Sequence, residues 1–259
     1  SGQGGADCIT LFDHGQINWS TGQVVARGRA APKGNKESDM ESVPGSARAN
    51  ANGHIIGILK QIRIYDDLLV GQYASGNDVI LAGIEKTARD AKTVRQTYTS
   101  ALDVEILIET SIFGGFLQLV LPDHIRQIPK LSLETPLASK APMGEISHTG
   151  LILDARGLEI EPALYPVIIS EQGDEIYSSV FVSREFAVQY GVCAYSCDMG
   201  TAMANRRIGS HPLVVKGLRK SGKEDTSIII SMTDAKKMEK VSQRHDFLKE
   251  CRVIIVKDP

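Results

Sequence analysis

The chain has 259 residues, enough for one large domain or two of ordinary size. Hydrophobic residues make up 42% and charged residues 23%, as in soluble globular proteins, so real cores can form without metal or disulfide staples. The formal charge of -2 gives no overall attraction to nucleic acid or to an acidic surface, and such binding would need a local basic patch.

The N-terminal third predicts a sheet and two helices. Ile17–Gly28 is typical of strands joined by a tight turn at Ser20–Gly22, with Trp19 as a core anchor, and residues 31–45 are expected to be loop. Ser46 is a plausible N-cap for a helix that runs to about Tyr65. Its apolar stripe would consist of Ala51, Ile55, Ile58, Ile62 and Tyr65.

Gly53 and Gly57 lie one turn apart inside this predicted helix. Each glycine costs about 1 kcal/mol of helix stability relative to alanine. We therefore expect a compensating close approach of the helix backbone to a sheet or to another helix at these two positions.

A second helix is predicted from Asn77 to Ala91, with Ser75 or Asn77 as its cap, and a clear strand follows at 102–109. In that strand four buried apolar residues would alternate with a wet, mostly acidic face that we interpret as solubilising rather than as a catalytic or cation site. The buried positions would be Leu102, Val104, Ile106 and Ile108, and the wet ones Asp103, Glu105, Leu107 and Glu109. An apolar segment from Ile112 to Leu121 would complete this first domain.

Four prolines between Pro122 and Pro142 predict an extended connector, because proline fixes φ and donates no hydrogen bond. The predicted division is therefore a domain at 1–121, a connector at 122–148 and a β-rich domain at 149–259. The second domain would open with a strand at Leu151–Leu153 and a turn at Asp154–Gly157.

Short strands dominate the rest of the second domain. Glu171–Asp174 predicts a hairpin turn, and alternation in Phe186–Tyr195 predicts a strand. The remaining expected strands are Glu175–Val182, Leu213–Leu218, Ile228–Ile230 and Cys251–Val256, and the expected short helices are Thr201–Arg207 and Thr233–Gln243.

Four cysteines are too few for a disulfide framework and have no zinc spacing: Cys8, Cys193, Cys197 and Cys251. On an unbroken strand four steps would part the sulfurs of Cys193 and Cys197 by about 13 Å. A disulfide needs Cα atoms within about 7 Å, so this pair bridges only if the strand breaks near Tyr195. Buried or half-buried thiols are the expectation, and pairing of Cys8 with another cysteine stays open.

The sequence contains no nucleophile elbow, zinc-helix, P-loop or dinucleotide motif, and its six histidines are scattered, so no catalytic, cofactor or metal residues are assigned. Asp154 and Arg156 flank Ala155 in the turn and are interpreted as a candidate structural ion pair. No apolar run reaches the roughly 20 residues of a membrane span. Ser1–Gly5 resembles a trimmed terminus, which leaves room for a removed export signal.

A run of cations without intervening acids extends from Arg206 to Lys223. Such a run suits an anionic partner, although it lacks the aromatic residues that stack on nucleic-acid bases. If it is a docking patch, charge reversal at Arg206, Arg207 and Arg219 should abolish partner association without lowering the melting temperature. The candidate patch consists of Arg206, Arg207, Lys216, Arg219, Lys220 and Lys223.

Several segments together carry a family resemblance. Ile17–Gly22, Val24–Gly28, the helix that starts at Ser46 and Ile112–Gly115 resemble the lipoprotein-20 type domain, which also forms the N-terminal part of flagellar assembly protein T. The second half, through Thr149–Leu158, Arg184–Ala187 and Phe247–Val253, is similar to a β-rich unit of no assigned activity that follows such a domain in exported bacterial proteins.

The resemblance implies an α+β fold with a helix on a small antiparallel sheet, followed by the β-rich domain. It also implies a periplasmic or outer-membrane-associated protein that acts by binding and assembly, without enzyme activity or cofactor. Its partner would be an envelope or flagellar protein, not nucleic acid, and any membrane association would be peripheral or through a lipid anchor of the precursor. A periplasmic small-ligand carrier or sensor is the alternative.

Overall fold

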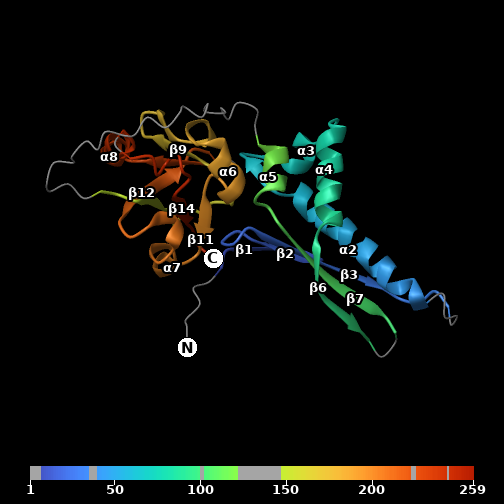
Figure 1. Ribbon diagram of the computed structural model, residues 1–259. Coiled ribbons are helices and arrows are strands. Elements are labelled where there is room, and N and C mark those ends of the chain that lie inside the picture. Colours follow the sequence, from blue (N-terminus) through green and yellow to red (C-terminus); the bar gives the residue numbers. More distant parts are fainter. Residues whose placement is uncertain (1–6, 35–39, 100–101, 122–146, 223–225, 244) are drawn as a thin grey trace, which may run out of the picture. The chain divides into compact units, whose positions relative to one another are not determined.

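The computed structural model describes residues 7–34, 40–99, 102–121, 147–222, 226–243 and 245–259. The chain forms two compact units, one made by Asp7–Val120 and the other by the residues from Leu121 onward (Figure 1). Most of the predicted proline-rich connector, residues 122–146, lies outside the described residues. Each unit combines helices with a sheet of its own, so the expected α+β class is confirmed.

The N-terminal unit is built on a five-stranded antiparallel sheet of order β1-β2-β3-β7-β6, and helix α2 lies across one face of it (Figure 1). Its strands are β1 (Ile9–Phe12), β2 (Gly15–Asn18), β3 (Gln23–Ala30), β6 (Lys92–Tyr98) and β7 (Val104–Ser111). Its helices are α2 (Val43–Lys60), α3 (Val70–Tyr73), α4 (Asp78–Arg89) and α5 (Gly115–Val120). A small ribbon pairs β4 (Arg63–Tyr65) with β5 (Leu68–Leu69).

Helix α2 begins and ends earlier in the chain than the predicted helix. Pro44 occupies its first turn, where a missing N–H costs nothing, so the helix begins ahead of Ser46. It ends at Lys60, and the chain then turns into β4. Ile62 is still buried, but Tyr65 is 42% exposed, so the C-terminal end of the predicted stripe was wrong.

The close approach expected at Gly53 and Gly57 is also wrong, because a Cβ at either position would meet nothing within 4 Å. The contact is made from the sheet instead. At Gly28 in β3 a Cβ would lie 2.2 Å from both the carbonyl oxygen of Ala47 and the amide nitrogen of Ala51. A glycine on the strand therefore lets the backbone of α2 rest directly on the sheet.

The second helix and its cap are confirmed. Asn77 Oδ1 accepts hydrogen bonds from the amides of Val79 at 3.1 Å and Ile80 at 3.2 Å, and α4 follows. In β7 the alternation is also confirmed from Val104 onward, but Leu102 precedes the strand, has φ 61° and is 51% exposed.

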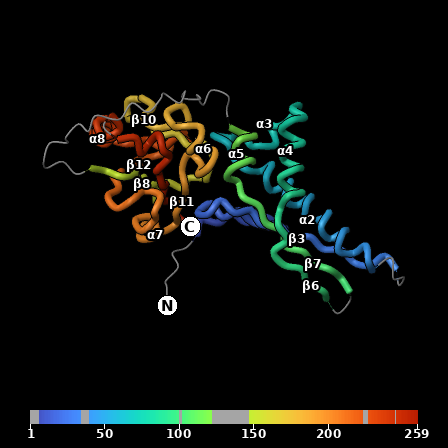
Figure 2. The backbone as a smooth tube through the Cα atoms, viewed as in Figure 1, coloured from blue at the N-terminus to red at the C-terminus, as the bar shows by residue number. Residues whose placement is uncertain are grey.

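The C-terminal unit contains a seven-stranded mixed sheet of order β10-β9-β13-β12-β8-β14-β11. Figure 2 shows the course of the backbone through this unit, with β8, β10, β11 and β12 labelled. Strand β8, in the interior of the sheet, is parallel to both neighbours, β12 and β14. Its strands are β8 (Gly150–Asp154), β9 (Val167–Ser170), β10 (Glu175–Tyr177), β11 (Ala194–Ser196), β12 (Pro212–Lys220), β13 (Ser227–Ile230) and β14 (Val253–Val256). Its helices are α6 (Arg184–Tyr190), α7 (Met199–Met203) and α8 (Met232–Ser242), with 3-10 turns η1 (Ser179–Phe181) and η2 (Arg206–Ile208).

One core layer of this unit lies between the sheet and the α7–η2 segment. Ile152 of β8 and Ile254 of β14 are almost fully buried against Ala202 and Ile208. Asp198 caps α7, since its Oδ2 accepts the Thr201 amide at 2.6 Å.

The predicted strand at Phe186–Tyr195 is wrong. Residues from Arg184 to Tyr190 form α6, which ends at Gly191 with φ 77°, and only Ala194–Ser196 is strand. The apolar residues of this stretch fit a short amphipathic helix as well as a strand, and Ser183 and Gly191 at its ends were the helix signals. Cys193 and Cys197 therefore flank the short strand β11 and are not four steps apart on one long strand, so the expected separation of about 13 Å does not apply.

Within the described part of the chain no helix is long and apolar enough to cross a bilayer.

Candidate functional site

Asp154 and Arg156 do form an ion pair at the carboxyl end of β8. Arg156 donates to Asp154 from Nε at 2.8 Å and from Nη2 at 3.0 Å, and Lys216 Nζ lies 3.3 Å from the same carboxylate. The hydrogen bonds from Arg156, assisted by Lys216 and opposed by burial, lower the pKa of Asp154 to about 2. These contacts fix the turn that follows β8.

The carboxyl ends of parallel strands are where open α/β sheets often bind ligands. Here the nearby acids are used in local structure: Asp198 caps α7, and Asp258 accepts the Gly157 amide at 2.7 Å. Among the residues that the structure describes, no three His, Cys, Asp or Glu side chains are grouped so as to hold a metal ion.

The predicted cationic patch is largely committed to contacts within its own domain. Arg207 donates to the carbonyl oxygens of Cys251 at 2.7 Å and of Tyr190 and Gly191 at 2.6 Å each. Lys216 is bound by Asp154, and Lys220 donates to the carbonyl of Glu159 at 3.2 Å. The side chains of Arg206 and Arg219 carry no such bond to a described residue, and Lys223 lies outside the described part of the chain.

Cys193 and Cys251 are free, buried thiols. Burial raises the pKa of each to about 12, although the charge of Arg207 acts in the opposite direction. Thiols with so little thiolate character are poor nucleophiles, so neither cysteine is placed for covalent catalysis.

A different charged surface is the open face of the N-terminal sheet, which is the side opposite α2, and only part of its charge is bound: Arg27 donates to the Asp13 carbonyl and Arg29 pairs with Asp103. Strand β3 contributes basic residues, β7 acidic residues and β6 basic residues again. Each outward-facing residue of β7 lies between one residue of β3 and one of β6. In that order, the neighbours are Arg27 and Arg95 for Leu107, Arg29 and Thr97 for Glu105, and Val25 and Lys92 for Glu109.

Four of these charged side chains have no partner among the described residues. Lys92, Arg95, Glu105 and Glu109 form no side-chain hydrogen bond or ion pair with any described residue, although Lys92 and Glu109 are direct cross-strand neighbours. The acidic face of β7 was predicted, but β6 was missed. Every residue of β6 is exposed, so its sequence shows no alternation that would reveal a strand.

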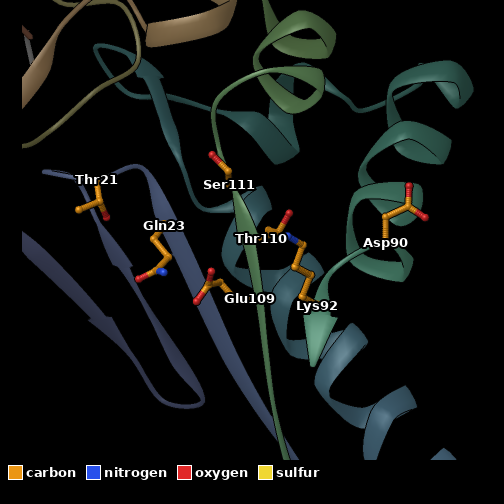
Figure 3. Close-up of a pocket in the computed structure, with 7 residues that line it drawn as sticks. All are labelled: Thr21, Gln23, Asp90, Lys92, Glu109, Thr110 and Ser111. Atoms are coloured by element: carbon orange, nitrogen blue, oxygen red, sulfur yellow. The ribbon is translucent and has the colours of Figure 1, made fainter. Parts of the chain in front are cut away.

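At one end of the open face the surface sinks into a depression of about 360 Å³. In Figure 3, Gln23 and Glu109 lie on neighbouring strands, Lys92 extends toward Thr110, and Asp90 points away from the other six. The full lining is Thr21, Gln23, Asp90, Lys92, Glu109, Thr110 and Ser111.

Comparison with known proteins bears on the C-terminal half. The family described as Treponema pallidum Tp0624, second domain, matches residues 150–259. A search of curated proteins finds no match to the chain. The region from β8 to the C-terminus is therefore a distinct second domain, similar to the second domain of Tp0624.

Proposed function

We propose that this is a non-enzymatic bacterial cell-envelope protein that acts by binding another protein, and that the open face of its N-terminal sheet is the binding surface. The observation that carries the proposal is the set of exposed or half-exposed charges on this face that have no partner within the described chain. Charged groups on a sheet usually pair across strands, which contributes to stability. Charged side chains that lie on neighbouring strands without pairing are available to bind a partner protein.

The charge pattern defines the partner's chemistry. Basic strands flank an acidic one, and Leu107 and Val25 are half-buried between them. A complementary protein surface would present a basic ridge opposite Glu105 and Glu109, with acidic residues opposite Lys92 and Arg95, since Arg27 and Arg29 of β3 are bound by the Asp13 carbonyl and by Asp103. Such complementarity sets orientation and association rate more than raw affinity, so binding should weaken as salt rises.

The envelope location, and a flagellar basal-body role in particular, is supported only by the resemblance of the N-terminal half to the lipoprotein-20 type domain. A small-ligand carrier or sensor is the second candidate function, and the polar depression at the end of the open face is the observation that favours it.

Site-specific photo-crosslinking in cells that express the protein tests the proposal. A photoreactive amino acid at Thr97, on the open face, should give a discrete protein adduct, whereas the same residue at the exposed Glu85 of α4 should not. Arg95→Glu should remove the Thr97 adduct without changing the melting temperature, because the Arg95 side chain forms no hydrogen bond or ion pair with any residue that the structure describes.

Arg219→Glu is the matched control, since Arg219 in the other domain is also exposed and its side chain forms no bond with any described residue. It should leave the Thr97 adduct intact. Loss of the adduct with Arg219→Glu, but not with Arg95→Glu, would assign partner binding to the cationic patch instead. An absence of adduct at Thr97 in the unaltered chain would refute the open face as the binding surface.

A further inference from the structure

We infer that the depression at the end of the open face is a binding site for a small zwitterion, a molecule of the amino-acid class that carries one carboxylate and one ammonium group. The inference does not rest on the proposed protein partner. It deepens the small-ligand function named above, and it uses Lys92 and Glu109 of the open face but not the neighbouring Arg95 or Glu105.

The depression collects polar groups that are free to bind. The side chains of Gln23, Lys92, Glu109 and Thr110 make no hydrogen bond to any other described residue. Ser111 Oγ accepts the Phe113 amide at 3.0 Å and still has its own proton to donate. Donors and acceptors therefore line one concave surface, as in small-molecule sites that fix ligand orientation.

The two charges decide the class of ligand. Lys92 and Glu109 are Cα partners on β6 and β7, yet their side chains are not within ion-pair distance of one another. The third charged residue, Asp90, is already paired with Lys86. The depression thus offers one free cation and one free anion among its lining residues.

Other classes fit less well. A simple anion would be attracted by Lys92 and repelled by Glu109, and a simple cation would meet the reverse. A sugar would leave both charges unneutralised, and no aromatic ring among the lining residues could stack on it. A zwitterion pairs its carboxylate with Lys92 and its ammonium with Glu109, while Gln23 and the hydroxyls hydrogen-bond the remaining oxygens.

Chemical-shift titration of the isotope-labelled chain tests this site. The probes are glycine, which carries both charges, and acetate, methylammonium and glucose, which each lack at least one. Glycine should shift the backbone amides of Gln23 and of residues 109–111 with a dissociation constant on the order of millimolar, because the depression is open and the ligand is small.

Matched variants distinguish direct contacts of Lys92 and Glu109 with the ligand from the long-range electrostatic effect of the other charges on the face. Lys92→Gln and Glu109→Gln should each weaken glycine binding at least about tenfold, by the loss of one charge-assisted contact. Arg95→Gln and Glu105→Gln, on the same strands and the same face, should leave it unchanged.

Three outcomes would overturn the inference. Acetate or methylammonium could bind as tightly as glycine, glucose could shift the same amides when glycine does not, or no probe could shift them. The titration of the unaltered chain tests the inference without any variant. The test therefore remains valid even if a variant fails to fold. Arg95→Glu, which should abolish partner crosslinking, should retain glycine binding, so the two proposals can fail separately.

Discussion

Asp154 ends β8, an interior strand of the C-terminal sheet, and its side chain is 13% exposed and bound by two cations. Its pKa of about 2 lies below the ordinary value of 3.8, so the folded state favours the ionised form. The contribution of the Asp154–Arg156 ion pair to the stability of the fold is therefore complete above about pH 4 and is lost as the pH falls through about 2. Since Arg156 is half exposed, solvent reduces the contribution to about 1 kcal/mol.

Asp154→Asn should accordingly lower the free energy of unfolding by about 1 kcal/mol at pH 7, as measured by urea denaturation. The gap between the variant and the unaltered chain should narrow as the pH is lowered from about 4 toward 2. A gap that stays constant over this range would show that Asp154 stabilises the turn through its shape rather than through its charge.

Two adjacent arginines of the predicted cationic patch should behave in opposite ways. Arg207→Ala removes three charge-assisted hydrogen bonds to backbone carbonyls and should destabilise the protein by about 3 kcal/mol. Arg206→Ala removes an exposed side chain that has no partner among the described residues, and it should change stability by less than about 0.5 kcal/mol. Thermal unfolding of both variants checks this. Equal effects would contradict the assignment of Arg207 as a structural clamp between η2, the end of α6 and Cys251.

The close packing of helix α2 on strand β3 depends on a glycine of the strand, Gly28, and not on a glycine of the helix, Gly53. Gly28→Ala should destabilise the N-terminal unit by about 2–3 kcal/mol, because its Cβ would overlap backbone atoms of Ala47 and Ala51 that cannot move aside. Gly53→Ala should stabilise it by about 1 kcal/mol, since the new methyl group enters open space on a helix.

Urea midpoints of the two variants measure both effects with the same method. If Gly53→Ala were as damaging as Gly28→Ala, the helix would approach another surface at Gly53. The structure describes no such contact.

The elements that sequence reasoning identified well have a strong local signal. Asn77 before an amphipathic run marks α4, and the alternation from Val104 to Ile108 marks β7. Short segments were less certain, as α6 shows, because five to seven residues satisfy both the strand and the helix periods.

The open face could not be predicted because it is made by pairing of strands far apart in the chain. Glu105 and Glu109 were recognised as a wet acidic face, but nothing local places Arg27 or Lys92 beside them. Their proximity follows from the register of β7 with β3 and β6. The cationic run at Arg206–Lys223 had the reverse problem: a clear sequence pattern whose members are mostly bound by their own domain.

Among the described residues, the strands of the C-terminal sheet all belong to the C-terminal unit. All seven strands of its sheet come from residues 150–256, and the N-terminal sheet takes none of its strands from that region. The match to the second domain of Tp0624 covers nearly the same residues, 150–259. Each sheet thus satisfies its backbone hydrogen bonds with strands of its own domain, as expected of independently folding domains.

A fragment of residues 147–259 should therefore fold alone. We expect dispersed amide resonances, a single cooperative thermal transition and slow hydrogen exchange in β8 and β14, the strands at the centre of its core. Arg207→Ala should lower the melting temperature of this fragment as it does that of the full chain, because every atom of the clamp lies within it. Collapsed resonances without a cooperative transition would instead mean that the C-terminal sheet needs contacts supplied by residues before 147, and that the two units fold as one.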